Sequence, residues 1–255
     1  MQHTNCTHSL HKPLVSGIGS YCVAYGKVDL RDLQPYALLI LEGAHYSSAE
    51  IQKSTSKDQV RVAYLSTTEV NLHAPYFDLL NDRCLAKNPN WNSRYLDPGD
   101  SLVREILLGL AKEYKAKGFD GLFLDTLDNT GSFGPLKHYR RRHIALLEDL
   151  RSDWPEGIFI QNSGLHLPSH IFNLLLRESV LSVIDLVTCA WEMRAETQQL
   201  ELLQSLLNYN EHFLLLEYAN TITQRHAIEK RMRELGCIGT VANLSLQGVP
   251  KFTSA

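Results

Sequence analysis

Residues 118–128 read Gly-Phe-Asp-Gly-Leu-Phe-Leu-Asp-Thr-Leu-Asp and are the most informative stretch of the chain. The apolar run Leu122–Leu124 predicts a buried strand, and that strand ends on Asp125. In an α/β protein, ligands bind outside the carboxyl ends of the strands, so an acid at this position is well placed for chemistry. The alternative is structural: Asp125 caps the helix that follows or binds the backbone of a loop.

Length and charge limit the class of protein. The chain has 255 residues, a formal net charge of -3 and a sequence pI near 6.4. This length suits a single α/β barrel, and the weak charge argues against general binding of nucleic acid. The densest basic run, Tyr139–His143, is expected to be the solvated face of a helix.

The sequence contains few indications of disulfide bonds, membrane association or cellular compartment. The five cysteines are scattered and odd in number, which favours neither a disulfide framework nor a zinc site. No apolar run approaches the roughly 20 residues of a membrane span, so no membrane association is expected. The first ten residues contain no apolar core of a signal peptide.

Short apolar runs predict nine strands, most of which lack strict alternation, as in strands buried on both faces. They are Tyr21–Tyr25, Ala37–Leu41, Val60–Ser66, Arg94–Asp97, Leu122–Asp125, Ile158–Gln161, Val183–Ala190, Phe213–Tyr218 and Gly239–Asn243.

Amphipathic segments between these runs predict helices. They are Ser101–Lys117, Leu136–Arg151, Pro168–Ser179, Ala195–Leu207 and Thr223–Leu235. Alternation of strand and helix indicates a parallel sheet with crossover helices, and we expect a (β/α)8 TIM-type barrel. Because such a barrel has eight strands, one of the nine candidates is an extra strand or a wrong assignment. We expect one domain over residues 21–255, after an irregular segment at 1–20.

Polar residues collect where the predicted strands end, whereas the strand interiors are almost wholly apolar. In chain order the ends are Tyr25-Gly26, Glu42-Gly43, Tyr64-Leu65-Ser66, Asp97, Asp125, Gln161-Asn162, Trp191-Glu192 and Glu217-Tyr218. This asymmetry predicts an acidic, aromatic pocket on one face of the barrel. Such a pocket suits a carbohydrate, because glycoside hydrolysis uses two carboxylates and sugar rings stack on aromatic side chains.

Other chemistries have weaker support in the sequence. The eleven histidines form no HxH or HExxH pattern on a strand end, no GxSxG elbow is present, and no phosphate-binding glycine loop occurs. We therefore expect no metal and no cofactor. A lyase or aldolase that holds a metal through carboxylates remains an alternative.

Several blocks resemble glycoside hydrolase family 114, the endo-α-1,4-polygalactosaminidases, in the same order along the chain. Residues 118–125 are the closest match to a family motif. The others are Val62–Glu69, Trp91 with Leu96-Asp97, Gln161-Asn162, Ile184–Val187 running on to Trp191-Glu192, and Glu217–Ala219. Thr68 departs from the pattern, because the family usually has glycine there.

The resemblance implies a (β/α)8 barrel that cleaves α-1,4-linked galactosamine polymers. It also implies that Asp125 and Glu192 are the catalytic pair, with Asp125 as nucleophile and Glu192 as general acid/base of a retaining reaction. The expected partner is a cationic or partly acetylated polysaccharide. Family members are usually secreted or extracytoplasmic.

Further strand-end residues are expected to bind substrate. Tyr64, Trp191 and Tyr218 are candidates for stacking on a sugar or for hydrogen bonding, and Asn162 for binding a hydroxyl or orienting the nucleophile. Carboxylates suited to the ammonium group of galactosamine, or to the pocket rim, are Glu42, Asp97, Asp128 and Glu217. A barrel that binds polysaccharide without cleaving it is the second alternative.

Overall fold

The computed structural model describes residues 18–53, 59–185, 188, 190–209 and 212–254. Its described residues gather into two compact units. Of the described residues, those within 18–41, 59–61 and 173–254 form the first unit, and those within 42–53 and 62–172 form the second. Most of the irregular segment expected at 1–20 lies outside the described residues, and the first strand begins at Tyr21.

An eight-stranded sheet runs through the chain in the order β1-β2-β3-β7-β8-β9-β12-β13. Spatial order therefore equals chain order, and β1 and β13 at its two ends contact each other within the first unit. Sequential parallel strands with intervening helices, in an order that returns to its start, define the (β/α)8 barrel class. The predicted fold class is confirmed.

In the second unit, three parallel strands place their carboxyl ends level with one another: β3 (Val60–Ser66), β7 (Gly121–Asp125) and β8 (Ile158–Asn162). Ser66 is paired with Asp125, and Leu124 with Gln161. The side chains of Leu122, Phe123 and Leu124 are completely buried, as the unbroken apolar run predicts.

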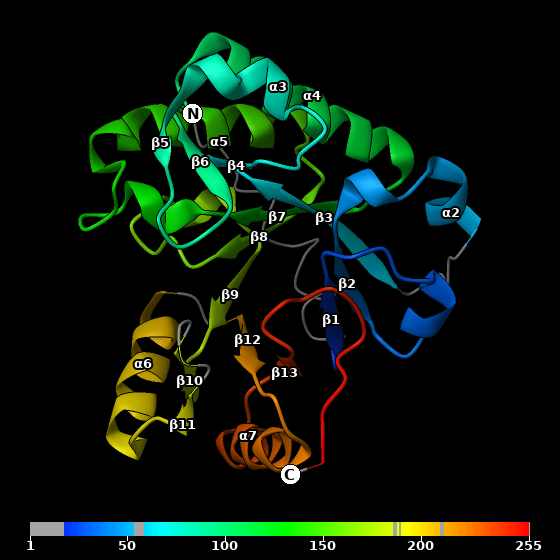
Figure 1. Cartoon of the computed structure of the whole chain (residues 1–255), viewed down its shortest axis with the longest axis vertical. Helices are drawn as coiled ribbons and strands as arrows, with labels where there is room; N and C mark the ends of the chain where they lie inside the picture. The colour runs from blue at the N-terminus through cyan, green and yellow to red at the C-terminus, as the bar shows by residue number, and fades with distance from the viewer. Residues whose placement is uncertain (1–17, 54–58, 186–187, 189, 210–211, 255) are drawn as a thin grey trace, which may run out of the picture. The chain divides into compact units, whose positions relative to one another are not determined.

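Helix α4 (Ser101–Lys117) has the bounds that its sequence predicts. The Asp100 carboxylate caps its first turn by accepting from Leu102 and Val103, and Gly118 ends it with a φ of 97°. A buried stripe packs toward β7 and toward α5 (Arg140–Asp153), which Figure 1 shows beside α4.

Smaller elements complete this unit: α2 (Ser48–Lys53), β4 (Glu69–Asn71), α3 (Phe77–Leu80), β5 (Cys84–Lys87), β6 (Ser93–Leu96), and the 3-10 turns η2 (Gly43–His45), η3 (Asn81–Arg83), η4 (Leu127–Thr130), η5 (Lys137–Tyr139) and η6 (Ser169–Ile171).

The first unit holds the other five strands of the large sheet: β1 (Tyr21–Ala24), β2 (Leu38–Leu41), β9 (Leu174–Glu178), β12 (Phe213–Tyr218) and β13 (Gly239–Ala242). All their pairings within this unit are parallel. It also holds η1 (Leu30–Leu33), α6 (Glu196–Tyr209), α7 (Ile222–Leu235) and the antiparallel pair β10 (Ser182–Ile184) and β11 (Trp191–Met193). A capping box of Thr221 and Gln224 begins α7.

Two of the nine predicted strands lie outside the large sheet, whereas one such strand was expected. Residues 94–97 largely form β6, which belongs to a separate three-stranded sheet with β4 and β5. Residues 183–190 contribute only to the β10–β11 pair, which is also outside the large sheet, and residues 186, 187 and 189 lie outside the described residues.

The eighth strand is β9, in a segment where the sequence predicts a helix from Pro168 to Ser179. Its run Leu174–Leu176 is buried on both faces, and a continuous apolar run of this length fits a buried helix as well as a buried strand.

The basic run Tyr139–His143 corrects a further expectation. Arg142 is largely exposed, but His143 is completely buried, so the segment is not simply a solvated face.

Candidate active site

Asp125 is the last residue of β7, and two neighbouring strands hold its carboxylate. Tyr64 of β3 donates its hydroxyl to Oδ2 over 2.9 Å, and Asn162 of β8 donates Nδ2 to Oδ1, also over 2.9 Å. The structure therefore brings together three of the predicted site residues. Both carboxylate oxygens have a donor, so the group is fixed in orientation while remaining half-buried.

Opposing effects act on the pKa of Asp125. Burial raises it above the ordinary value, and the negative charge of Glu69 raises it further. Hydrogen bonds from the backbone at Thr126 and from the side chains of Asn162 and Tyr64 lower it. These donors favour the ionised form, which is the form that a nucleophile or a general base requires.

The residue after Asp125 adopts a backbone conformation that is rare for a residue with a side chain. Thr126 has a φ of 61°, Ser163 after Asn162 has 60°, and Ser179 after the last residue of β9 has 53°. Leu246 is the remaining non-glycine residue of this kind in the described ranges. Such strained positions cluster at functional sites, so the pattern marks the ends of β7, β8 and β9.

Glu178, the last residue of β9, is a site candidate that the sequence analysis missed. Its Oε2 accepts a hydrogen bond of 2.5 Å from the hydroxyl of Tyr218, the last residue of β12. Leu174–Glu178 reads LLLRE, an apolar triplet followed closely by an acid, much like the LFLD of β7. This similarity indicates a strand that ends on an acid. It was not recognised because residues 168–179 were predicted to be a helix.

Glu192 lies in a different setting from the one predicted. It is an exposed residue in the middle of β11 and is paired with Val183 of β10. Trp191 before it is half-buried and donates its indole N–H to the carbonyl of Tyr218 over 3.1 Å. Neither residue ends a strand of the large sheet.

Glu217 is completely buried in the first unit. Its carboxylate accepts from the backbone N–H groups of Val180, Leu181 and Ser182, at 2.7, 2.8 and 2.9 Å, and from the Ser182 hydroxyl at 2.8 Å. These bonds fix the segment that follows Glu178, so the structure gives Glu217 a structural role near the end of β9.

Three other predicted acids have local partners in the second unit. Glu42 caps η2 by accepting from the Ala44 N–H, and burial raises its pKa. Asp97 accepts from the Gly99 N–H over 2.8 Å and forms an ion pair with Arg142. Asp128 is exposed and accepts from the Gly164 N–H over 3.0 Å.

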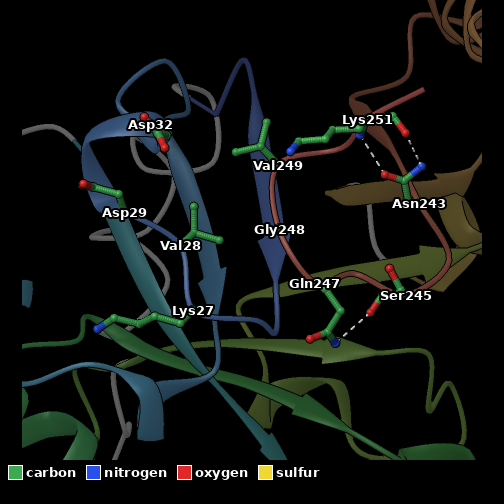
Figure 2. Close-up of a pocket in the computed structure, with 10 residues that line it drawn as sticks. All are labelled: Lys27, Val28, Asp29, Asp32, Asn243, Ser245, Gln247, Gly248, Val249 and Lys251. Atoms are coloured by element: carbon green, nitrogen blue, oxygen red, sulfur yellow. Dashed lines mark hydrogen bonds between the residues drawn. The ribbon is translucent and has the colours of Figure 1, made fainter. Parts of the chain in front are cut away.

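A cavity of about 440 Å³ lies in the first unit, beyond the carboxyl ends of β1 and β13 (Figure 2). The segment after β1 supplies Lys27, Val28, Asp29 and Asp32, and the rest of the lining is Asn243, Ser245, Gln247, Gly248, Val249 and Lys251. The N–H of Tyr25 donates to the carbonyl of Leu246 over 2.6 Å, which joins the two segments. With two lysines and two aspartates, the charges of the lining balance.

In the described part of the chain, no three or more His, Cys, Asp or Glu side chains gather in a way that could hold a metal ion. Over the same residues, no helix is both long enough and apolar enough to span a membrane.

A (β/α)8 sheet places the last residues of its strands, such as Asp125 of β7, where proteins of this class bind their ligands. Comparison with known proteins gives the family: the family model of glycoside-hydrolase family GH114 matches residues 20–153, just over half of the 255 residues. The chain belongs to this family. A search of curated protein sequences found no match.

Solved structures share the fold at low identity. The glycoside hydrolase domain of PelA from Pseudomonas aeruginosa is 22% identical, with a TM-score of 0.79 over 94% of this chain and 100% of that one. Ega3 from Aspergillus fumigatus, solved in complex with galactosamine, is 14% identical, with a TM-score of 0.70 over 90% of this chain and 93% of that one. A maltogenic α-amylase, AmyB from Thermotoga neapolitana, is 9% identical, with a TM-score of 0.55 over 88% of this chain and 65% of that one.

Proposed function

We propose that this protein hydrolyses a polysaccharide containing α-1,4-linked galactosamine, with Asp125 and Glu178 as its carboxylate pair. Membership of GH114 supports glycosidase chemistry, and the galactosamine bound to Ega3 supports the choice of sugar. The observation that carries the proposal is the shared design of two strand ends. Each carboxylate closes a strand of the large sheet, accepts a tyrosine hydroxyl, and precedes a residue with positive φ.

Asp125 is proposed as the nucleophile, because donors on both oxygens favour its ionised form and aim it. Glu178 is proposed as the general acid/base. In the first step Glu178 protonates the glycosidic oxygen while Asp125 bonds to the anomeric carbon, and the leaving sugar departs. In the second step Glu178 removes a proton from water, whose oxygen displaces Asp125 and restores the free carboxylate.

Glu178 replaces Glu192 in this proposal because of where the two residues lie. Ligands of a (β/α)8 barrel bind at the carboxyl ends of its strands. Glu178 ends such a strand, whereas Glu192 is exposed on a pair of strands outside the large sheet. Glu192 stays a prediction from the resemblance, and the experiment below decides between the two.

The test is incubation of the pure protein with α-1,4-galactosamine oligomers, fully de-N-acetylated and partly acetylated, with products followed by mass spectrometry. We expect shorter oligomers from the native protein, and a fall in kcat of about 10³-fold or more for Asp125→Asn and Glu178→Gln. We expect Glu192→Gln to keep most of the activity. Loss of activity in Glu192→Gln but not in Glu178→Gln would return the acid/base role to Glu192.

Binding of both oligomers without any product would instead indicate a polysaccharide-binding barrel. The anomer released first, followed by NMR in the active protein, reports the stereochemistry. The retained anomer is expected, and the inverted anomer would remove Asp125 from the role of nucleophile.

A further inference from the structure

A chain of hydrogen bonds lies behind Asp125 in the second unit, and the proposed reaction does not use it. Thr67, directly after β3, donates its hydroxyl to the backbone carbonyl of Asp125 over 2.9 Å. The same Oγ1 lies 2.9 Å from Nε2 of His143 on α5, whose Nδ1 lies 2.8 Å from Oγ1 of Thr130. That oxygen lies 3.1 Å from Nε2 of His166, which is half-buried.

The number of protons available for these hydrogen bonds determines which partner of each bond is the donor. A carbonyl oxygen only accepts, so the single proton of the Thr67 hydroxyl is committed to Asp125. The contact between Thr67 and His143 then requires an N–H on Nε2 of the imidazole. A neutral imidazole with its proton on Nε2 accepts at Nδ1, so Thr130 donates to His143, and His166 donates to Thr130.

The opposite direction would turn the Thr67 hydroxyl away from Asp125. His143 Nδ1 would then donate to Thr130, and Thr130 would donate to His166 at 3.1 Å or to the carbonyl of Leu127 at 3.3 Å. Thr67 Oγ1 and the carbonyl oxygen of Asp125, which are 2.9 Å apart, would face each other with no proton between them. Two acceptors at this distance repel each other, so the geometry favours a proton on Nε2.

This series of hydrogen bonds ends at the backbone carbonyl of Asp125, the last residue of β7. Thr67 also donates its N–H to the carbonyl of Asp125 over 3.2 Å, and the Thr126 hydroxyl donates to it over 2.7 Å. Since Thr126 has a positive φ, the peptide that follows Asp125 is in an unfavourable conformation, and these bonds oppose its relaxation. A fixed carbonyl fixes the Cα of Asp125 and therefore the origin of its carboxylate.

We propose that His143 is a positioning residue: a neutral imidazole with its proton on Nε2 that acts through Thr67 to hold Asp125 in place. The role in turnover rests on the proposed function of Asp125, whereas the position of the proton does not. His143 has no exposed surface. Burial lowers its pKa to about 3, and the nearby His166 acts in the same direction, so the ring stays neutral around pH 7.

The position of the proton is tested by ¹⁵N NMR of the histidine side chains in the full-length protein between pH 5 and 8, with His143→Gln to assign the signals. We expect the His143 Nε2 to carry the proton and its Nδ1 to remain bare over the whole range. A proton on Nδ1, or formation of the imidazolium ion within this range, would overturn the proposal.

The positioning role is tested with His143→Leu, which has an apolar side chain, and His143→Gln, whose amide offers a donor and an acceptor. For His143→Leu we expect kcat to fall by about 10- to 100-fold with KM within about twofold, because displacement by about 1 Å has effects of this size. His143→Gln should recover part of kcat. The Thr67 amide, which donates to the same carbonyl, should exchange its proton faster in His143→Leu.

His170→Leu, which changes an exposed histidine of the same unit, is the control and should leave kcat and amide exchange unchanged. Equal kcat and equal Thr67 exchange in His143→Leu and in the native protein would overturn the positioning role. A native protein that cleaves no oligomer would overturn the proposed function instead, and the NMR and exchange measurements would still decide whether His143 holds Asp125.

Discussion

At the scale of single residues, Tyr64 links the geometry of Asp125 to its protonation. Its hydroxyl donates to Oδ2 and thereby lowers the pKa that burial raises. Loss of this donor disfavours the charged form, so in Tyr64→Phe the pKa of Asp125 rises. We expect the acidic limb of the pH profile of kcat/KM to move up by about one unit. Tyr139→Phe, on η5, should keep the native profile, and a Tyr64→Phe limb at the native pH would contradict this account.

Positive φ at Ser179 leads to a second residue-scale prediction. Glycine tolerates a φ of 53° without steric cost, although it loses more entropy on folding. We therefore expect Ser179→Gly to raise the free energy of unfolding by up to about 1 kcal/mol. Gly236→Ala at a φ of 66°, where an added Cβ meets nothing within 4 Å, should lower it by about 1 kcal/mol. Chemical denaturation measures both, and shifts of the same sign would count against strain at Ser179.

Much of the neighbourhood of Asp125 could be predicted from the sequence, and its support could not. Tyr64, Asp125 and Asn162 lie near or at the carboxyl ends of apolar runs, and neighbouring parallel strands bring such ends together. His143 reaches Thr67 only because α5 packs with one particular face inward. A basic run on a helix contains no signal for that rotation.

At the scale of elements, the hardest segment to predict was Leu174–Ser182. Its apolar run suits a buried helix or a buried strand, and β9 forms because strands on both sides are available for pairing, which a local sequence does not reveal. Because residues 168–179 were assigned to a helix, Glu178 was not considered as a strand-end acid, and Glu192 was predicted instead. Glu217 was predicted to bind substrate because it lies near a strand end, a position that does not reveal that its side chain is buried among backbone donors.

Glu217 therefore leads to an element-scale prediction about the segment after β9. In Glu217→Gln an NH2 group replaces one carboxylate oxygen and faces N–H donors that it cannot satisfy. We expect the free energy of unfolding to fall by about 2–4 kcal/mol. The matched variant is Glu229→Gln on α7, whose partly exposed pair with Arg225 should contribute less than about 0.5 kcal/mol. Similar losses in the two variants would show that Glu217 does not hold this segment.

At the scale of the whole molecule, the alternation of strand and helix was sufficient for the fold class. Seven of the eight strands of the large sheet lie within or close to predicted runs, because strands buried on both faces are continuous apolar runs. Local composition did not distinguish strands of this sheet from those of the two smaller sheets. That distinction depends on pairing between distant segments.

His143 also makes global stability depend on pH. Its pKa is about 3 in the folded protein, against an ordinary value of 6.5. Below about pH 6.5 this histidine therefore binds a proton in the unfolded chain, whereas in the folded protein it stays neutral until the pH approaches 3. Stability should therefore fall as the pH decreases from 6.5 toward 3, by up to about 1.4 kcal/mol per unit from this residue. We expect a shallower slope in His143→Gln, measured by denaturation at successive pH values. An unchanged slope would mean that His143 is protonated in the folded protein.

The first unit combines segments that precede and follow the second unit along the chain, whereas the second unit is nearly continuous. During synthesis, β1 and β2 therefore leave the ribosome before the second unit, whereas β9, β12 and β13 of the same unit follow it. We expect the second unit to become ordered on the nascent chain while the apolar strands β1 and β2 are not yet paired with the rest of the first unit. Unpaired apolar strands are prone to aggregation, so we expect a chaperone that shields extended apolar peptides to bind β1 and β2 during translation.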